Sequence, residues 1–172
     1  TLEMVKELEL IAPVHISDIY TIDDSLKLIK MYGSLFLKED KATEIINSIK
    51  QKRLDFKDFI EAKPKFKTVY FIWKTPWLIA ANQTFINKML SINNYENYFG
   101  HLQRYPEIEL EVNKNVDLVL LSSEPFPFKE EHIYQLKPFF PNAEIKIVDG
   151  EMFSWYGSRL LKAFDYFKML HQ

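Results

Sequence analysis

Residues 38–62 read KEDKATEIINSIKQKRLDFKDFIEA, and they lie in the longest part of the chain with neither Gly nor Pro. The apolar positions that recur in it at three-to-four and seven-residue intervals are Ile45, Ile49, Phe56 and Ile60. Such a stripe is typical of one face of a helix whose charged opposite face meets water. The spacing predicts a helix of about 24 residues, or roughly 36 Å, that ends before Pro64. This length exceeds the usual globular helix and suits a strut between two bodies.

Beyond Pro64 the chain alternates between strand-like and helix-like segments. Apolar, β-branched and aromatic runs predict strands at Val69–Trp73, Leu118–Leu121 and Ile145–Val148. Helical patterns are found at Thr84–Leu90, Glu130–Phe140 and Gly157–Leu170, with a helical turn at Glu109–Asn113. Strands that alternate with helices imply a parallel sheet with helices on both faces. The predicted fold class is α/β, a doubly wound, mainly parallel sheet in a Rossmann-like lobe that follows the long helix.

The part before the long helix is short. It predicts a helix over residues 2–11, a short strand over Pro13–Ile16 and a helix that begins at Thr21, with Asp24 at the spacing of a capping box. No apolar run is long enough to span a bilayer. The first residues, 1–3, show neither the basic nor the apolar part of a signal peptide, which leaves the location of the protein open.

The composition excludes several kinds of function. A net charge of −2 provides no overall basic field for nucleic acid or anionic lipid. The absence of Cys excludes disulfides, thiolate metal sites and a Cys nucleophile. No metal site is predicted, because the four His are scattered without zinc-binding spacing at His15, His101, His132 and His171. Aromatic residues make up 15% of the chain, enough to leave some for a binding surface as well as the core.

Aromatic residues follow all three predicted strands of the second part. They lie in residues 73–77, 122–128 and 149–157, and Pro residues stiffen two of these segments. Because ligands of open parallel sheets bind beyond the carboxyl ends of the strands, the three segments predict one cleft for a large, flat, apolar ligand. The alternative is that the same aromatic residues plug the end of the core. Phe126, in the second of these segments, is predicted to contact the ligand because of its place at this edge.

Candidate catalytic groups are few. Glu124, Asp149 and Glu151 fall on the same predicted edge, where a carboxylate pair could do acid–base work, but such residues more often cap helices or bond loop amides. No nucleophile elbow or phosphate-binding glycine loop is present. Arg159 begins the last predicted helix, where a cation is unfavourable. It either pairs with Asp149 or Glu151, or meets an anionic group of a ligand.

Several motifs in this order carry a family resemblance. They are the long helix, the segment from Trp73 to Ile86, Tyr95–Phe99, Tyr105–Glu111, the strand Val116–Leu121, and Asp149 through Arg159. Together they resemble the helical-backbone metal-receptor group of periplasmic binding proteins, which includes the cobalamin and ferric-siderophore receptors. Glu109 stands where that family often has Ser, and Ala81 stands near a usual Gly. The resemblance covers nearly the whole chain, but only the second part of such a receptor.

The resemblance implies three parts and a ligand between two lobes. Residues 1–37 would be the remnant of an N-terminal lobe, 38–63 the backbone helix, and 64–172 the C-terminal α/β lobe. By position in the motifs it assigns Tyr105 to the cleft and Trp73, Trp77, Trp155 and Tyr156 to ligand loops. It assigns Glu111 to docking on the permease of an ABC transporter. The expected ligand is a bulky metal chelate, first a corrinoid and then a ferric siderophore or haem, with no cofactor of the protein's own and a periplasmic or cell-envelope location.

Two other classes of function stay open at this point. One is an enzyme on a similar α/β scaffold that uses Glu124, Asp149 or Glu151. The other is a soluble, receptor-like regulatory protein that is not coupled to transport. The preferred prediction is a binding protein without catalytic residues, in which Arg159 completes the set of ligand contacts.

Overall fold

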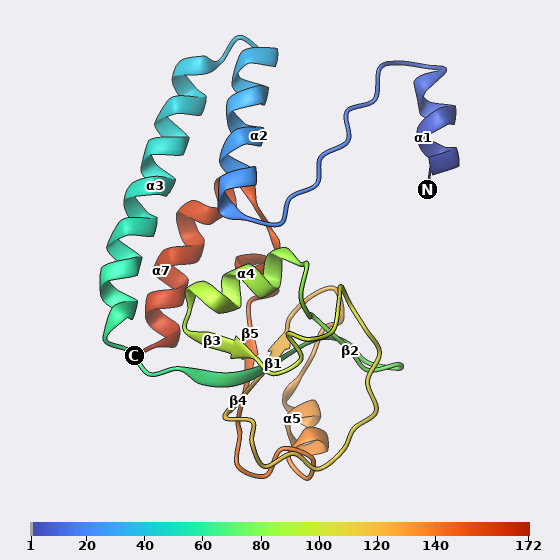
Figure 1. Cartoon of the computed structure of the whole chain (residues 1–172), viewed down its shortest axis with the longest axis vertical. Coiled ribbons are helices and arrows are strands. Elements are labelled where there is room, and N and C mark those ends of the chain that lie inside the picture. Colours follow the sequence, from blue (N-terminus) through green and yellow to red (C-terminus); the bar gives the residue numbers. More distant parts are fainter. Residues whose placement is uncertain (1) are drawn as a thin grey trace.

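The computed structural model describes residues 2–172. Its longest element is the helix predicted from residues 38–62. This helix, α3 (Glu39–Glu61), has 23 residues and is about 34 Å long at 1.5 Å per residue. In Figure 1 it runs along one side of the molecule, beside α2 (Ile22–Leu35) in its first half and α7 (Leu160–Leu170) in its second. The predicted helix is therefore confirmed to within one residue at each end.

The buried stripe of α3 meets different partners along its length. Near its start, Ala42 lies against Gly33 of α2, where a Cβ on the glycine would come within 2.5 Å of the Ala42 Cβ. A larger residue at Gly33 would push the two helices apart. Near the end of α3, the Phe56 ring contacts Phe164 and Phe167 of α7 at centroid distances of 5.8 and 5.9 Å. Aromatic packing thus joins the second half of α3 to the last helix of the chain.

Five strands form one sheet beside these helices: β1 (Phe66–Trp73), β2 (Leu78–Ile79), β3 (Tyr95–Asn97), β4 (Leu118–Ser122) and β5 (Glu144–Val148). β1, β4 and β5 are parallel neighbours, with Val69 opposite Val119 and Val119 opposite Ile145. β3 is parallel to the first half of β1, and β2 is antiparallel to its second half. The prediction of an α/β fold with a mainly parallel sheet is confirmed.

The sheet separates two apolar cores. Tyr70 and Ile72 of β1 point into the first core, which α3, α7, α4 (Phe85–Ile92) and α6 (Gly150–Ser154) cover. Val69 and Phe71 point into the second core, which α5 (Glu130–Leu136) and the irregular segment 98–117 cover. Because alternate residues of one strand serve opposite faces, β1 is buried on both sides, as a central parallel strand should be.

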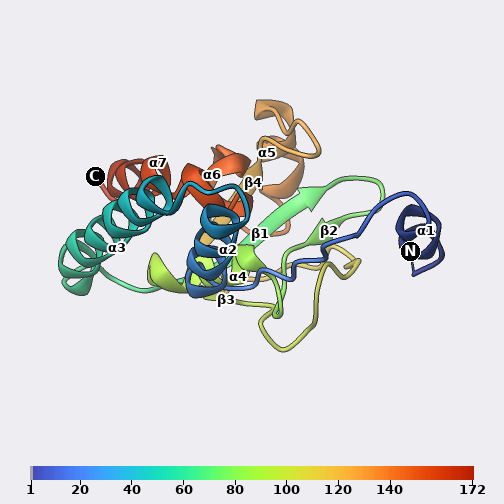
Figure 2. The ribbon, with the colours of Figure 1, turned by 90° about the horizontal axis from the view of Figure 1, so that it is seen from above.

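The start of the chain packs least. In Figures 1 and 2, α1 (Leu2–Glu9) stands apart from the other helices, and it buries none of its residues. The strand predicted at Pro13–Ile16 is wrong, because this stretch finds no neighbouring strand within residues 2–172 to bond its amides. The capping box predicted at Thr21 and Asp24 is confirmed at the start of α2. Thr1, the first residue of the predicted N-terminal part, lies outside the described residues.

Four local predictions in the second part need correction. The helical turn predicted at Glu109–Asn113 is wrong, because the flanking amides bond other segments: Ile108 N–H donates to the Trp77 carbonyl, and Asn113 N–H donates to the Phe139 carbonyl. The helix predicted to reach Phe140 ends at Leu136, since Pro138 offers no N–H to continue it. Residues 150–154, predicted as loop, form α6. The last predicted helix begins with one 3-10 turn, η1 (Gly157–Arg159), before α7.

Candidate functional site

The carboxyl ends of β1, β4 and β5 meet at one edge of the sheet. The three strands are parallel and in register, so the segments that follow Trp73, Ser122 and Val148 leave the sheet on the same side. β4 lies between the other two, and its loop therefore reaches both neighbours. The prediction that the three aromatic segments share one edge is confirmed.

One group of rings fills the part of this edge between β1 and β4. The ring cluster consists of Trp73, Trp77, Phe126, Phe128 and His132. Trp73 meets Phe126 edge to face at 5.6 Å, and Phe126 lies 4.7 Å from Phe128. Trp77 stacks on Phe128 at 6.2 Å, with the two planes 11° apart. The His132 ring turns its edge to both Phe rings, and its Nδ1 accepts the Lys129 N–H at 2.9 Å, which fixes the orientation of the imidazole.

Burial divides the ring cluster into a base and a rim. Phe128 and His132 are each only 5% exposed. Trp77 and Phe126 are half-buried, whereas Trp73 keeps 38% of its surface exposed. For Phe128 the core-plug interpretation is correct. Trp73, at the end of β1, is the member of the cluster that offers most ring surface to a ligand.

The second group lies beyond β5 and is held by polar contacts. The Trp155 tip consists of Trp155, Tyr156, Arg159, Glu124 and Glu151. Trp155 Nε1 donates to Glu124 Oε1 at 2.6 Å, and the Arg159 guanidinium lies over the indole at 5.3 Å from the centroid. Arg159 also forms an ion pair with Glu151, so the pairing that the sequence left open falls on Glu151. Trp155 and Tyr156 are 49% and 42% exposed.

Glu124 connects the loop after β4 to the Trp155 tip. Its Oε1 accepts a second hydrogen bond, from Ser154 Oγ at 3.1 Å. The approach of the two loops depends on Gly150, because a Cβ there would lie 2.8 Å from the Glu124 Cγ and closer still to the Ser122 hydroxyl. Sequence reasoning listed Glu124 only as a candidate acid. The structure makes it the residue that orients the indole.

The Trp155 tip also contacts the start of α2. The Gly157 N–H donates to Ser25 Oγ at 2.8 Å, and the Ser25 side chain is fully buried. Gly157 has φ +79°, a left-handed conformation that suits glycine. On the other side, the Tyr156 ring meets Phe85 at the start of α4 at 5.9 Å. The aromatic edge of the sheet therefore reaches the helix that precedes α3.

Tyr105 lies in a third place, with two residues that sequence reasoning missed. Arg104 Nη1 donates to the Tyr20 hydroxyl at 3.1 Å, and the guanidinium lies 5.8 Å from the Tyr20 ring and 6.0 Å from the Tyr105 ring. Burial raises the pKa of Tyr105, so its hydroxyl stays protonated. In the described part of the chain no ring contact joins Tyr105 to the other two groups. The position of Arg104 directly before the Tyr105-Pro106 motif was the one available signal.

Glu111 lies on the irregular segment 108–117 and is exposed. Its carboxylate makes no hydrogen bond or ion pair with residues 2–172, so it is available to an external partner. The structure does not test its predicted docking role. Its surroundings differ from the prediction, because Glu111 stands on an irregular segment and not on the predicted helical turn.

The three candidate catalytic carboxylates all have structural partners. Glu124 accepts from Trp155 and Ser154, and Glu151 pairs with Arg159. Asp149 caps α6, with its Oδ1 accepting the Glu151 N–H at 3.0 Å. Within residues 2–172 no group of three His, Asp or Glu side chains is placed to hold a metal ion. The chemistry that the edge offers is therefore apolar and hydrogen-bonding contact through exposed Trp and Tyr rings.

Comparisons with known proteins place this fold. No protein-family model matches the chain, and no curated protein matches it either. Solved structures do match, among them a possible iron-binding (periplasmic solute-binding) protein from Staphylococcus epidermidis, with 21% identity and a TM-score of 0.75 over 98% of this chain and 69% of that one. The vitamin B12 binding protein BtuF of Vibrio cholerae has 12% identity and a TM-score of 0.78, with the same coverage.

A third match is S. aureus IsdE, solved in complex with heme, with 15% identity and a TM-score of 0.78 over 98% of this chain and 71% of that one. None of the helices in residues 2–172 is long and apolar enough to cross a bilayer. The three structural matches show that the chain has the fold of periplasmic binding proteins and spans roughly seven-tenths of their length.

Proposed function

We propose that the protein is the substrate-binding component of an ABC importer and captures a bulky metal chelate for delivery to a permease. The observation that carries this proposal is the aromatic edge of the sheet, where Trp73, Trp155 and Tyr156 expose large ring surfaces around the loop of β4. Three structures with this fold belong to proteins described as binding iron, vitamin B12 or heme. Binding without turnover agrees with an edge whose candidate acids all serve structural contacts.

The ligand class follows from the kind of surface offered. Covering apolar area contributes about 25 cal/mol per Å² before the costs of ordering and association. A broad ring system can cover exposed indole and phenol faces together, which a small polar solute cannot. A corrinoid is our first choice, followed by a ferric siderophore or haem. Arg159 already has Glu151 as its counterion, so an anionic ligand would compete for it.

We propose that the chain consists of two lobes and a connecting helix. Residues 1–37 belong to the first lobe, 38–63 to the connecting helix, and 64–172 to the second lobe. The contacts of α2 and Tyr20 with the Trp155 tip and Arg104 support this, because they bring the first part to the rim of the aromatic edge. The ligand would lie at this junction, against Tyr105 as well as the two aromatic groups. Glu111 would face an arginine of the permease, at the outer side of a membrane.

A ligand titration of the 172-residue chain tests the proposal. Cyanocobalamin, haemin and a ferric hydroxamate siderophore are each added while the fluorescence of the three Trp is recorded. Saturable quenching of the folded chain by one of the ligands supports the proposal. The Trp155→Phe variant should then show weaker quenching by that same ligand. The unfolded chain serves as the control for inner-filter effects. If none of the three ligands quenched the folded chain more than the unfolded chain, the proposed function would be wrong.

A further inference from the structure

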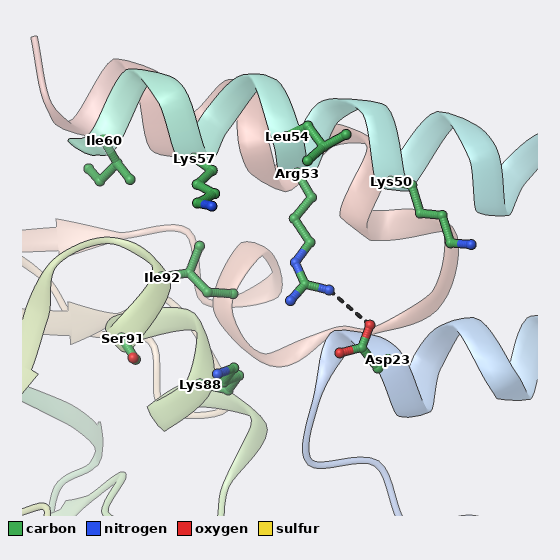
Figure 3. A pocket seen from close by; sticks show the side chains of 9 residues that line it. All are labelled: Asp23, Lys50, Arg53, Leu54, Lys57, Ile60, Lys88, Ser91 and Ile92. Atoms are coloured by element: carbon green, nitrogen blue, oxygen red, sulfur yellow. Dashed lines mark hydrogen bonds and ion pairs between the residues drawn. The ribbon is translucent and has the colours of Figure 1, made fainter.

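A basic groove lies among three helices, away from the aromatic edge. It has a volume of about 620 Å³. Figure 3 shows its side chains, which come from the start of α2, the second half of α3 and the end of α4. They are Asp23, Lys50, Arg53, Leu54, Lys57, Ile60, Lys88, Ser91 and Ile92. Four of these carry a positive charge and one a negative charge, in a chain whose net charge is −2.

The lysines of this groove differ from the other lysines of α3. Outside the groove, Lys41 pairs with Glu44 at 2.8 Å and Lys52 pairs with Asp165 at 2.5 Å. Lys50, Lys57 and Lys88 have no ion pair or hydrogen bond with any part of the chain that the structure describes. On one face α3 thus pairs its lysines with carboxylates, whereas on the groove face its lysines have no counterion within residues 2–172 and only Arg53 is paired.

Arg53 is only partly satisfied by the groove. Its Nη1 donates to Asp23 Oδ1 at 2.9 Å, the dashed line in Figure 3. A guanidinium has five N–H donors, and this is the one hydrogen bond that the Arg53 side chain makes within residues 2–172. Figure 3 also shows Lys57 on α3, on the same side of the helix as Arg53, and Lys88 on the facing α4. Three cationic side chains from two helices therefore line one groove.

The cations on the groove face of α3 repel one another and so raise the free energy of the folded chain. Lys50, Arg53 and Lys57 lie three and four residues apart, so their charges share one face of α3, and like charges at such spacings destabilise a helix by about 0.2–0.5 kcal/mol per pair. A bound anion would reverse the sign of this term. Between the cations lie the half-buried Ile92 and the buried Ile60, which give part of the groove an apolar floor.

We infer that this groove binds a compact polyanion that carries phosphate or carboxylate groups. Its volume lies in the range of small-molecule sites, and its concave shape fits a discrete molecule better than a flat membrane surface. Arg53 supplies a planar donor for one anionic group, and Lys57 and Lys88 supply point charges for the next. Because the groove joins α2 to α3 and α4, a bound polyanion holds the part before α3 against the lobe after it.

The inference is tested by calorimetry with pyrophosphate and with citrate, each in buffer whose ionic strength is held constant with KCl. Saturable binding is expected, together with a higher melting temperature, because a ligand of the native state stabilises it by mass action. Pyrophosphate binding alone assigns a phosphate ligand, and citrate binding alone assigns a carboxylate. No saturable heat from either anion, beyond that of KCl, overturns the inference.

Two matched variants separate the groove from the overall charge. The double change Lys57→Gln and Lys88→Gln removes two exposed groove charges and should weaken anion binding about tenfold, equivalent to losing one weak ion pair for each lysine. The double change Lys30→Gln and Lys114→Gln removes the same charge from exposed sites elsewhere and should leave binding unchanged. Equal weakening in both variants would show general electrostatics and contradict a built site. Neither variant touches the aromatic edge, so the result does not depend on the proposed function.

Discussion

In the ring cluster, aromatic side chains contact one another, whereas at the Trp155 tip the indole contacts two charged side chains. Trp77 stacks on Phe128, and Phe128 is almost fully buried. Trp155, by contrast, is held by the Glu124 carboxylate and the Arg159 guanidinium while half of its surface stays exposed. The two regions occupy the same edge of the sheet. Their difference indicates that the ring cluster extends the core, whereas the tip holds its indole in place with a large part of its surface exposed.

The largest expected effect separates the two regions by stability. Phe128→Ala should lower the free energy of unfolding by about 3 kcal/mol, because it opens a cavity among Trp77, Phe126 and His132. Trp155→Ala removes a side chain that is 49% exposed and should change stability by only about 0.5 kcal/mol. Urea unfolding of both variants measures the contrast. Similar losses in the two variants would mean that the tip is as much a part of the core as the ring cluster.

The next effect tests the tip through ligand affinity. Trp155→Ala should weaken binding of the ligand identified by titration about tenfold, or 1.4 kcal/mol, because a stacking face is lost. Trp155→Phe keeps a ring in place and should recover part of this loss. The dissociation constants come from absorbance of the ligand, which does not depend on Trp emission. Unchanged affinity in Trp155→Ala would assign ligand contact to other parts of the edge.

A smaller effect concerns the link between the two regions. Glu124→Ala removes the acceptor of the Trp155 Nε1–H and should weaken ligand binding by about 1 kcal/mol, the typical contribution of one hydrogen bond. Glu124→Gln keeps an acceptor oxygen and should restore most of the affinity. With Trp73 and Trp77 changed to Phe, Trp155 alone reports, and acrylamide should quench it more in the Ala variant than in the Gln variant.

A double-mutant comparison excludes a general structural effect of Glu124. Phe at position 155 has no N–H to donate, so in the Trp155→Phe background Glu124→Ala should add little further loss of affinity. If the two losses simply add, Glu124 acts by another route. This result concerns the orientation of one indole and differs from a failure of ligand binding as such.

The same contrast explains what the sequence could predict. The helix α3 follows from apolar spacing within 25 consecutive residues, and the capping box at Thr21 and Asp24 follows from two residues three apart. Both patterns involve residues close together in the sequence, so the helix and the cap could be predicted without a structure. The segment 108–117 bonds to Trp77 and Phe139, and no local pattern reports partners about 30 residues away. Its predicted helical turn was wrong for that reason.

The site shows the same limit. The parallel order of strands correctly predicted that aromatic segments would share one edge, because carboxyl ends of parallel strands must do so. Whether a particular ring is buried or exposed depends on neighbours from other loops. Phe128 lies under Trp77, whereas Trp155 lies beside Glu124 and Arg159. The ligand roles of Trp73, Trp77, Tyr105, Phe126, Trp155, Tyr156 and Arg159 stay predictions.

The smallest expected effect concerns the charge of Arg159. Its ion pair with Glu151 is partly exposed, with side chains 27% and 33% accessible, so water screens it and Arg159→Gln should change stability by about 0.5 kcal/mol. The effect on binding should depend on the ligand. Cyanocobalamin, which is neutral overall because its cobalt centre balances its phosphodiester, should keep its affinity within about twofold, whereas a ligand with a free carboxylate should lose about fivefold because a charge-assisted hydrogen bond disappears.

Glu151→Gln provides the opposite change and sharpens the comparison. It releases Arg159 from its counterion, so a carboxylate-bearing ligand should bind more tightly to this variant than to the unchanged chain. Haemin titrations of the Arg159→Gln and Glu151→Gln variants measure the two directions. Affinity that moves the same way in both would mean that the ion pair acts only by holding the indole of Trp155 in place. Opposite movements would make Arg159 a ligand contact, and the Trp155 tip would then select among ring ligands by charge as well as by shape.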